Sequence, residues 1–332
     1  MDPGRLGVTL VTSEISTLIE YRAFRNTDPP QLAEIWRSHA TTRGLMQPMS
    51  VTAFDRFVLS KPTFDREGLI VAVDEGKLIG FGHAGFGPNE TGDALSTDRG
   101  VTSLVLVRPD ADPAVARELL ARCETYLRAR GANALYAGGS YPLSPFYYGM
   151  YGGSELSGVL DSDVYAGELY RAAGYQAGKR SVVLHRDLAG FRPVVDRQQI
   201  QIRRATRLET MIDPPANSWW DAVMFEQFDR TRWSVVEREG GPSLASVYVW
   251  DLETMAGAWG VRAVGIVDLE VTSDRRRRGL ATNLLGEAFR QLHAQGVSLA
   301  EVHVPEENAP GRAVFTNLGF EQVDGSTLYF KD

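Results

Sequence analysis

The sequence is poor in cysteine and has no long hydrophobic run. Cys123 is the single cysteine, so no disulfide can form within the chain, and its helical surroundings are typical of a small buried residue. No apolar segment reaches the roughly 20 residues that cross a bilayer, and the N-terminal residues lack the basic start and apolar core of a signal peptide. We therefore expect a cytoplasmic protein with no membrane partner.

Positive charge is also scarce, and so are the patterns of several enzyme classes. The chain has 35 Lys and Arg against 42 Asp and Glu, and its net charge of -7 disfavours binding to nucleic acid. No cluster of His, Cys and carboxylate residues has metal-ligand spacing, and no nucleophile-elbow or Walker pattern is present. We expect no metal and no nucleic-acid partner, and any anion-binding site has to be local.

What is present is an ordinary globular composition spread over two similar halves. The 332 residues, 43% hydrophobic and 23% charged, exceed the usual size of one compact domain. An order of strand, helix, hairpin, strand and helix begins near residue 21 and recurs after residue 200. The sequence therefore predicts a mixed α/β (α+β) protein with an arm at 1–20, a first domain at 21–186, a linker at 187–199 and a second domain at 200–332.

The elements predicted in each half allow the two copies to be aligned. In the first half the patterns predict a hairpin at 69–86 and an amphipathic helix at 113–130. In the second half they predict strands at 200–204 and 263–271. Aligning the copies leaves the first one with about 19 additional residues after Ala137.

The most specific feature is the segment between the 263–271 strand and the helix after it, Val271-Thr-Ser-Asp-Arg-Arg-Arg-Arg-Gly-Leu-Ala281. A tight glycine-containing turn that leads into a helix leaves backbone N–H groups unpaired. Gly279 and Ala281 let an anion approach the backbone, and the helix dipole and the arginines add positive potential. The segment predicts a diphosphate site. The alternative, a solvated basic helix N-terminus, is unfavourable because cations suit the other end of a helix.

This segment resembles the signature of the Gcn5-related N-acetyltransferase (GNAT) superfamily, with Arg276, Gly279 and Ala281 at its three defining positions. Asn308 and the later Gly319-Phe320 pair resemble a second motif of that superfamily. The resemblance implies two tandem GNAT folds, each a mixed, mostly antiparallel central sheet flanked by helices, and acetyl-CoA as co-substrate. The residues that it implies for acetyl-CoA binding are Val271, Arg276, Arg277, Arg278, Gly279, Leu280, Ala281, Asn308 and Phe315.

Direct acetyl transfer to an amine needs a base beside the acetyl group. Glu270 and Asp268 lie on the strand before the loop, where their spacing places both on one face, and they are the candidate bases. Relatives have their base near the position of Gly265, which cannot serve, so a water relay or His303 are alternatives. Phe315 stands where many relatives have a tyrosine that protonates the leaving thiolate, so water or another group has to supply that proton.

The matching loop in the first half has lost the signature. It contains no glycine between Arg108 and Arg117, and Asp112 replaces the signature arginine ahead of Pro113, which lacks an N–H. We predict that the first copy binds coenzyme A weakly or not at all and braces the fold or forms a wall of the acceptor site. The aromatic groups at 147–151 and 219–220 either line that site or pack in the core, which is their commoner use.

The expected function is therefore transfer of an acetyl group from acetyl-CoA to a primary amine of a small molecule or peptide, with the chemistry in the C-terminal domain. The protein is expected to be a monomer or a homodimer. Its layout is similar to the mycothiol synthase type of two-domain acetyltransferase, although no residue pattern transfers that chemistry. The alternative is a non-catalytic acyl-CoA sensor in which Phe315 and Gly265 mark lost catalysis.

Overall fold

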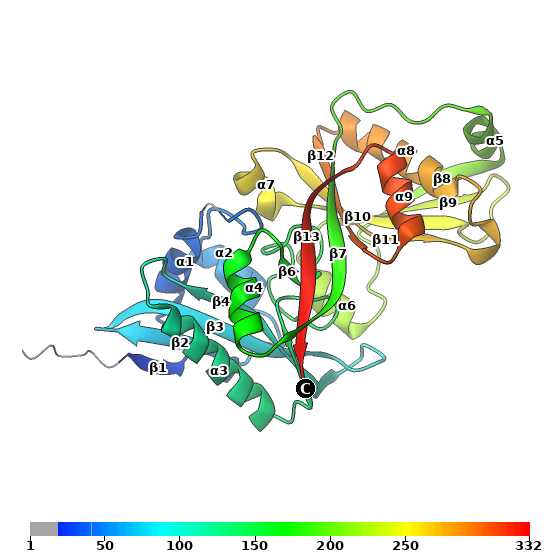
Figure 1. Ribbon diagram of the computed structural model, residues 1–332. Helices are drawn as coiled ribbons and strands as arrows, with labels where there is room; N and C mark the ends of the chain where they lie inside the picture. The colour runs from blue at the N-terminus through cyan, green and yellow to red at the C-terminus, as the bar shows by residue number, and fades with distance from the viewer. Residues whose placement is uncertain (1–18, 41) are drawn as a thin grey trace, which may run out of the picture.

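The computed structural model describes residues 19–40 and 42–332, so nearly all of the predicted arm at 1–20 lies outside the described residues. The chain forms two lobes joined by long strands (Figure 1). A single sheet of 13 strands extends through both lobes, and most of its neighbouring strands are antiparallel. The predicted mixed fold, with a mostly antiparallel sheet flanked by helices, is confirmed.

The first lobe is built on an antiparallel meander of four strands and a fifth strand that lies parallel to the fourth. In sheet order they are β1 (Glu20–Ala23), β2 (Leu69–Asp74), β3 (Lys77–Pro88), β4 (Leu95–Val107) and β5 (Ala134–Ala137). The hairpin predicted at 69–86 is formed by β2 and β3. Its turn residues Glu75 and Gly76 have φ values of 47° and 80°, the left-handed conformation that matches the twist of a tight hairpin.

The helix predicted at 113–130 is α3 (Pro113–Ala129). Asp112 caps it by accepting the N–H of Ala114 at 2.7 Å, and Pro113 occupies its first turn, where a missing N–H costs nothing. The buried residues recur every three or four positions and face the sheet, and they include Cys123, which is 0% exposed. The other helical segments of this half are α1 (Pro29–Arg37), α2 (Val51–Phe54), η1 (Asp55–Leu59), η2 (Arg66–Gly68) and α4 (Val164–Ala172).

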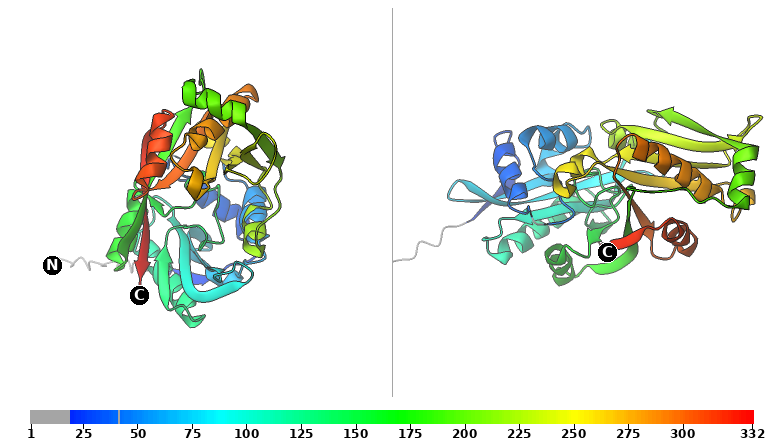
Figure 2. Two further views of the ribbon diagram at one scale, coloured as in Figure 1. Left: turned by 90° about the vertical axis from the view of Figure 1, so that its right-hand side faces the viewer. Right: turned by 90° about the horizontal axis from the view of Figure 1, so that it is seen from above.

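The second lobe repeats this arrangement. Its strands lie in the order β12 (Leu299–Pro305), β11 (Ala263–Val271), β10 (Ala245–Asp251), β9 (Arg230–Glu237) and β8 (Thr206–Ile212). The helix α8 (Leu280–Ala294) lies along these strands (Figure 2). The remaining helical segments are α5 (Arg197–Ala205), α6 (Trp219–Phe225), α7 (Glu253–Trp259), η3 (Ser273–Arg275) and α9 (Ala309–Asn317).

The prediction of a strand at 200–204 was wrong, because these residues belong to α5. Asp196 caps this helix by accepting the N–H of Gln199 at 2.7 Å, and the first strand of the lobe, β8, begins only at Thr206. The alternation of isoleucine with polar residues resembles a half-buried strand. In the structure, however, Ile200 is 42% exposed and only Ile202 packs against the core.

The two halves exchange their last strands. β13 (Glu321–Lys331), at the end of the second half, leaves its own lobe and pairs with β5 of the first. β7 (Gln176–Asp187), from the first half, pairs with β12 of the second lobe on one side and with β13 on the other. The short strand β6 (Val159–Leu160) also pairs with β13. Figures 1 and 2 show β13 running beside β7 into the first lobe, so each lobe is completed by a strand of the other half.

An aromatic core fills the junction between the lobes. It joins residues from both halves, and the ring of Tyr148 packs against Phe225 at 4.8 Å and Trp250 at 5.2 Å. Tyr147 and Tyr151 are also buried, and each is at most 4% exposed. The aromatic group at 147–151 therefore packs in the core, which excludes it as an open pocket wall.

Candidate functional site

The loop between β11 and α8 forms a row of free backbone donors. Gly279 has a φ of 77° and turns the chain into α8, which begins at Leu280 without a side-chain cap. Within the described residues, the backbone N–H groups of 276–281 find no protein acceptor. Amides that are left free at the positive end of a helix dipole favour a phosphate ligand. The predicted diphosphate cradle therefore has the backbone geometry that such a site requires.

The arginines of the loop add uncompensated charge to these donors. Arg276 donates from Nε to the carbonyl of Val271 at 3.1 Å, and Arg275 pairs with Glu237 at 3.1 Å. Arg276, Arg277 and Arg278 are exposed and form no ion pair with the described part of the chain. Their charge is therefore available to an anion.

The helix α5 supports the loop from the side where Gly279 has no side chain. Gln199 donates from Nε2 to the carbonyl of Gly279 at 3.2 Å and accepts from Nδ2 of Asn283 at 3.1 Å. A Cβ atom at position 279 would lie 2.9 Å from Nε2 of Gln199. Next to this contact, Arg204 and Arg278 are among the residues lining a surface pocket of about 590 Å³.

The other predicted cofactor residues lie in different settings. Leu280 is buried, and Val271 and Ala281 are half-buried beside the loop. Asn308 is exposed and caps α9 by accepting the N–H of Gly311 at 3.0 Å. Phe315 is only 3% exposed, and its ring packs in the core with Phe320 at 5.1 Å. A contact of Asn308 or Phe315 with the cofactor stays a prediction.

The predicted bases lie where β11 is interrupted by a bulge. The pairing with β10 shifts between Tyr248 opposite Val267 and Ser246 opposite Glu270, and Asp268 has a φ of 52°. Asp268 and Glu270 are both exposed. The chain around the Asp268 carboxyl removes part of its hydration and so raises its pKa, the charge of Glu270 raises it further, and Arg230 opposes both effects. The two carboxylates thus share one acidic patch on the strand before the loop.

A segment of the first half is seated on this strand. Trp250 on β10 donates from its indole N–H to the carbonyl of Ser154 at 3.2 Å. A Cβ atom at Gly265 would lie 2.6 Å from Cβ of Ser154, so the missing side chain at Gly265 makes room for that segment. The additional residues that the sequence indicated after Ala137 contain this segment, which places the next residue, Glu155, near Asp268.

Glu155 is a candidate site residue that no pattern in the sequence indicated. Burial of its carboxyl raises its pKa to about 7, the charge of Asp268 contributes to the rise, and His303 opposes it. Glu155 is half-buried, and the charged groups that act on its carboxyl are those of Asp268 and His303. Its sequence surroundings, rich in glycine and aromatic residues, have no period that could reveal this position.

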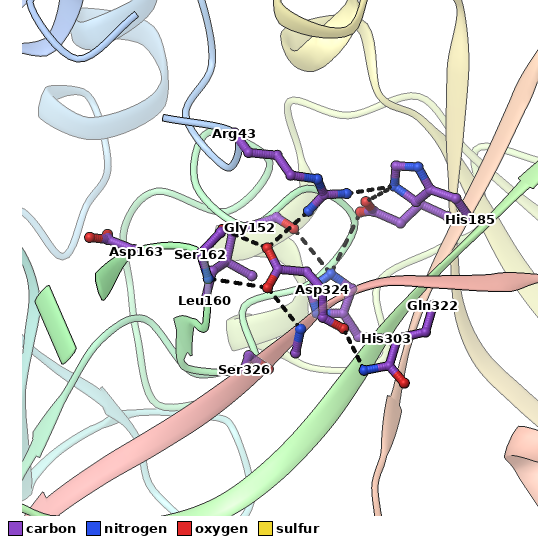
Figure 3. A network of polar contacts seen from close by, with 12 residues as sticks. Arg43, Gly152, Leu160, Ser162, Asp163, His185, His303, Gln322, Asp324 and Ser326 are labelled. Carbon is purple, nitrogen blue, oxygen red and sulfur yellow. Dashed lines mark hydrogen bonds and ion pairs between the residues drawn. The ribbon is translucent and has the colours of Figure 1, made fainter. Parts of the chain in front are cut away.

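A buried polar network anchors the same segment (Figure 3). The carboxylate of Glu301 on β12 is 0% exposed, accepts the N–H of Ser154 at 2.6 Å and contacts Nε2 of His185 at 2.5 Å. His303 contacts the hydroxyl of Ser157 through Nδ1 at 2.6 Å and the carbonyl of Gly152 through Nε2 at 3.0 Å. Both ring nitrogens of His303 are thus engaged, which favours a structural role over that of a base.

Charged groups of both halves continue this network. Arg43 reaches Nε2 of His185 at 3.3 Å and the carboxylate of Asp324 at 3.2 Å. Burial alone would raise the pKa of Glu301, but the neighbouring imidazoles of His185 and His303 outweigh this effect and lower the pKa to about 2. Glu301 therefore carries a stable negative charge between strands of the two halves.

The first copy has no equivalent cradle. Its loop leads into α3 through Asp112 and Pro113, and the Asp112 carboxylate already satisfies a helix N–H. Within residues 19–40 and 42–332, no group of three or more His, Cys, Asp or Glu side chains is arranged to hold a metal ion. Among the described helices, none combines the length and apolarity needed to span a bilayer.

Three solved structures share the fold of almost the whole chain. The first is a GCN5-related glucosamine N-acetyltransferase region of a fungal multi-domain β-N-acetylglucosaminidase, with a TM-score of 0.68 and 16% identity over 95% of this chain and 38% of that one. The second is a tandem GNAT protein from the clavulanic acid biosynthesis pathway, with a TM-score of 0.65 and 16% identity over 95% and 98%. The third is a GCN5-related N-acetyltransferase from Sphaerobacter thermophilus, with a TM-score of 0.63 and 15% identity over 94% and 95%.

The second half of the chain matches a known protein family by sequence. Residues 207–320 match the acetyltransferase (GNAT) family, and this range contains β11, the donor loop and α8. No curated protein sequence matches the chain. The chain spans 38% of the fungal protein and nearly the full length of the other two structural neighbours. Residues 207–320 thus match the GNAT acetyltransferase family, and the chain as a whole shares the fold of a tandem GNAT protein.

Proposed function

We propose that the chain transfers the acetyl group of acetyl-CoA to a primary amine of a small molecule or peptide, and that the reaction takes place in the C-terminal half. The free N–H groups of 276–281 support this proposal most strongly, because they suit the diphosphate of coenzyme A. The corresponding turn of the first half is filled by the Asp112 cap. We therefore expect one acetyl-CoA site per chain.

The charge around β11 supports an amine acceptor. Asp268 and Glu270 are exposed on the strand that leads into the donor loop, and Glu155 lies near Asp268. Carboxylates beside an acetyl group attract an ammonium ion and can accept its proton. The overall charge of -7 favours encounter with a cationic acceptor in the same way. In this proposal the protein acts in the cytoplasm.

Calorimetry tests the proposed cofactor, and an acetyl-transfer assay tests the proposed acceptor. Purified protein should release heat on binding coenzyme A with a stoichiometry of one, since the matching turn of the first copy is occupied by the Asp112 cap and by Pro113. Acetyl-CoA should then be consumed with at least one amine in a panel of amino sugars, polyamines, aminoglycosides and N-terminal peptides. The panel includes amino sugars because one structural neighbour is described as a glucosamine N-acetyltransferase region. Absence of binding would contradict the proposal that coenzyme A is the cofactor. Binding without transfer would contradict the proposal that the acceptor is an amine.

A further inference from the structure

The segment from Gly152 to Ser157 belongs to the first half but is held by the second. Trp250 and Glu301 fix Ser154 through its carbonyl and its N–H, and His303 contacts Gly152 and Ser157 on either side. These four contacts come from β10 and β12, the two strands that flank β11 in the sheet. The segment therefore has a fixed position over β11, and it brings Glu155 with it.

The position of this segment compensates for the missing side chain on β11. Gly265 has no side chain, and Cβ of Ser154 approaches the space that a side chain there would fill. We infer that Glu155, a residue of the first half, is the general base that takes the proton from the acceptor amine in the second half. This inference rests on the proposed amine acetyltransferase activity and assigns its proton acceptor.

The surroundings of Glu155 suit a base better than those of the other carboxylates. Asp268 and Glu270 are exposed, whereas Glu155 is half-buried and follows Ser154, which β10 and β12 hold in place. The charged and titratable groups that face it are Asp268 on β11 and His303 on β12. Burial raises the pKa of Glu155 to about 7, so half of its carboxyl groups are ionised near neutral pH and able to accept a proton.

The proton balance of the reaction follows from this position. An acceptor ammonium gives one proton to the Glu155 carboxylate, and its nitrogen, now with a free electron pair, bonds to the thioester carbonyl carbon. The carbon–sulfur bond breaks with its electron pair on sulfur, and a second proton of the amine neutralises the thiolate through solvent. The protonated Glu155 then returns its proton to water. The exposed Asp268 and Glu270 hold the positive charge of the incoming acceptor.

The test compares Glu155→Gln with Glu155→Asp and with Glu168→Gln, which removes an exposed carboxylate of α4 in the same half. With an amine accepted by the wild type, we expect Glu155→Gln to lower kcat about 100-fold or more, the usual contribution of a general base. The wild-type kcat/KM should fall about tenfold per pH unit below about pH 7, and this decrease should be absent in Glu155→Gln. Glu155→Asp should keep the pH dependence at a lower rate, and Glu168→Gln should resemble the wild type.

A direct titration provides a readout that does not need activity. In protein with 13C-labelled glutamate carboxyls, the resonance missing from Glu155→Gln should titrate near pH 7 in the wild type. Calorimetry with coenzyme A should give the same affinity for all variants, which excludes a general loss of folding. If the wild type acetylates an amine and Glu155→Gln keeps its rate or its pH dependence, the inference about Glu155 is overturned and the proposed function stands. If the wild type acetylates no amine, both are overturned.

Discussion

Replacement of Gly279 by alanine is expected to weaken coenzyme A binding about 100-fold, whereas the same change at Gly296 should leave binding unchanged. Both glycines have a positive φ, 77° at Gly279 and 88° at Gly296, and they lie at opposite ends of α8. A methyl group at 279 would stand 2.9 Å from Gln199, while nothing lies within 4 Å at 296. The first substitution therefore pushes the amide of Gln199 away from the carbonyl of Gly279, so the loop and its amides lose that support. The second substitution adds only backbone strain.

The expected loss of coenzyme A affinity in Gly279→Ala follows from the hydrogen bonds to phosphate that the loop would lose. A displaced loop loses about two charge-assisted hydrogen bonds to phosphate, each worth about 1.5 kcal/mol, which corresponds to roughly 100-fold in affinity. The left-handed conformation should cost each variant a similar 1–2 kcal/mol of folding stability, about the same for both positions. Calorimetry with coenzyme A and urea unfolding measure the two quantities separately. Equal affinity of Gly279→Ala and Gly296→Ala would show that the loop does not hold the diphosphate.

Local patterns in the sequence predicted the elements that local interactions form. The hairpin of β2 and β3 depends on its own turn residues, and α3 begins at its own Asp-Pro cap. The donor loop is equally local, because a strand, a glycine and a helix start follow one another within a few residues. Such features require no knowledge of distant neighbours.

The strand exchange could not be predicted in the same way. β13 has the pattern of an ordinary strand, and nothing within it specifies β5 and β7 as its partners. The predicted boundary at 186–187 separates the halves along the chain, but the central strands of the sheet alternate between them. Register and partner choice depend on the complete tertiary structure, which a reading of one segment at a time does not include.

The position of Glu155 also depends on tertiary contacts that the sequence does not reveal. The sequence indicated additional residues after Ala137 and a possible contribution of the first copy to the acceptor site. It gave no reason to choose one carboxylate, because the segment lies on irregular backbone that contacts β10, β11 and β12 only in the folded chain. Residues that act on loops against another element are found from contacts and not from periodicity.

Replacement of Glu301 by glutamine is expected to lower the free energy of unfolding by about 3 kcal/mol at neutral pH. The carboxylate is 0% exposed, accepts the N–H of Ser154 and contacts Nε2 of His185, and Nε2 of His303 lies 3.6 Å away. Loss of its charge therefore leaves these buried groups without their charged partner. Its pKa is lowered on folding from 4.5 to about 2. This group therefore stabilises the fold above about pH 4.5, and its contribution is lost as the pH falls towards 2.

Urea unfolding at a series of pH values tests this expectation. Between pH 7 and pH 2 the difference in unfolding free energy between the wild type and Glu301→Gln should shrink towards zero, because protonation removes the charge that the substitution has already removed. Glu168→Gln, at an exposed site, should follow the wild type throughout. A difference below about 0.5 kcal/mol at neutral pH, the range of ordinary surface substitutions, would contradict the role of Glu301.

The same variant separates the anchoring of the Glu155 segment from cofactor binding. Glu301 accepts the N–H of Ser154, the residue before Glu155, whereas the donor loop at 276–281 has no hydrogen bond to Glu301. Glu301→Gln should therefore lower kcat by releasing the segment and should leave the affinity for coenzyme A within about twofold of the wild type. If kcat and the affinity for coenzyme A fell together, the network would support the whole second lobe. A fall in kcat alone would show that the network acts by holding the first-half segment over β11.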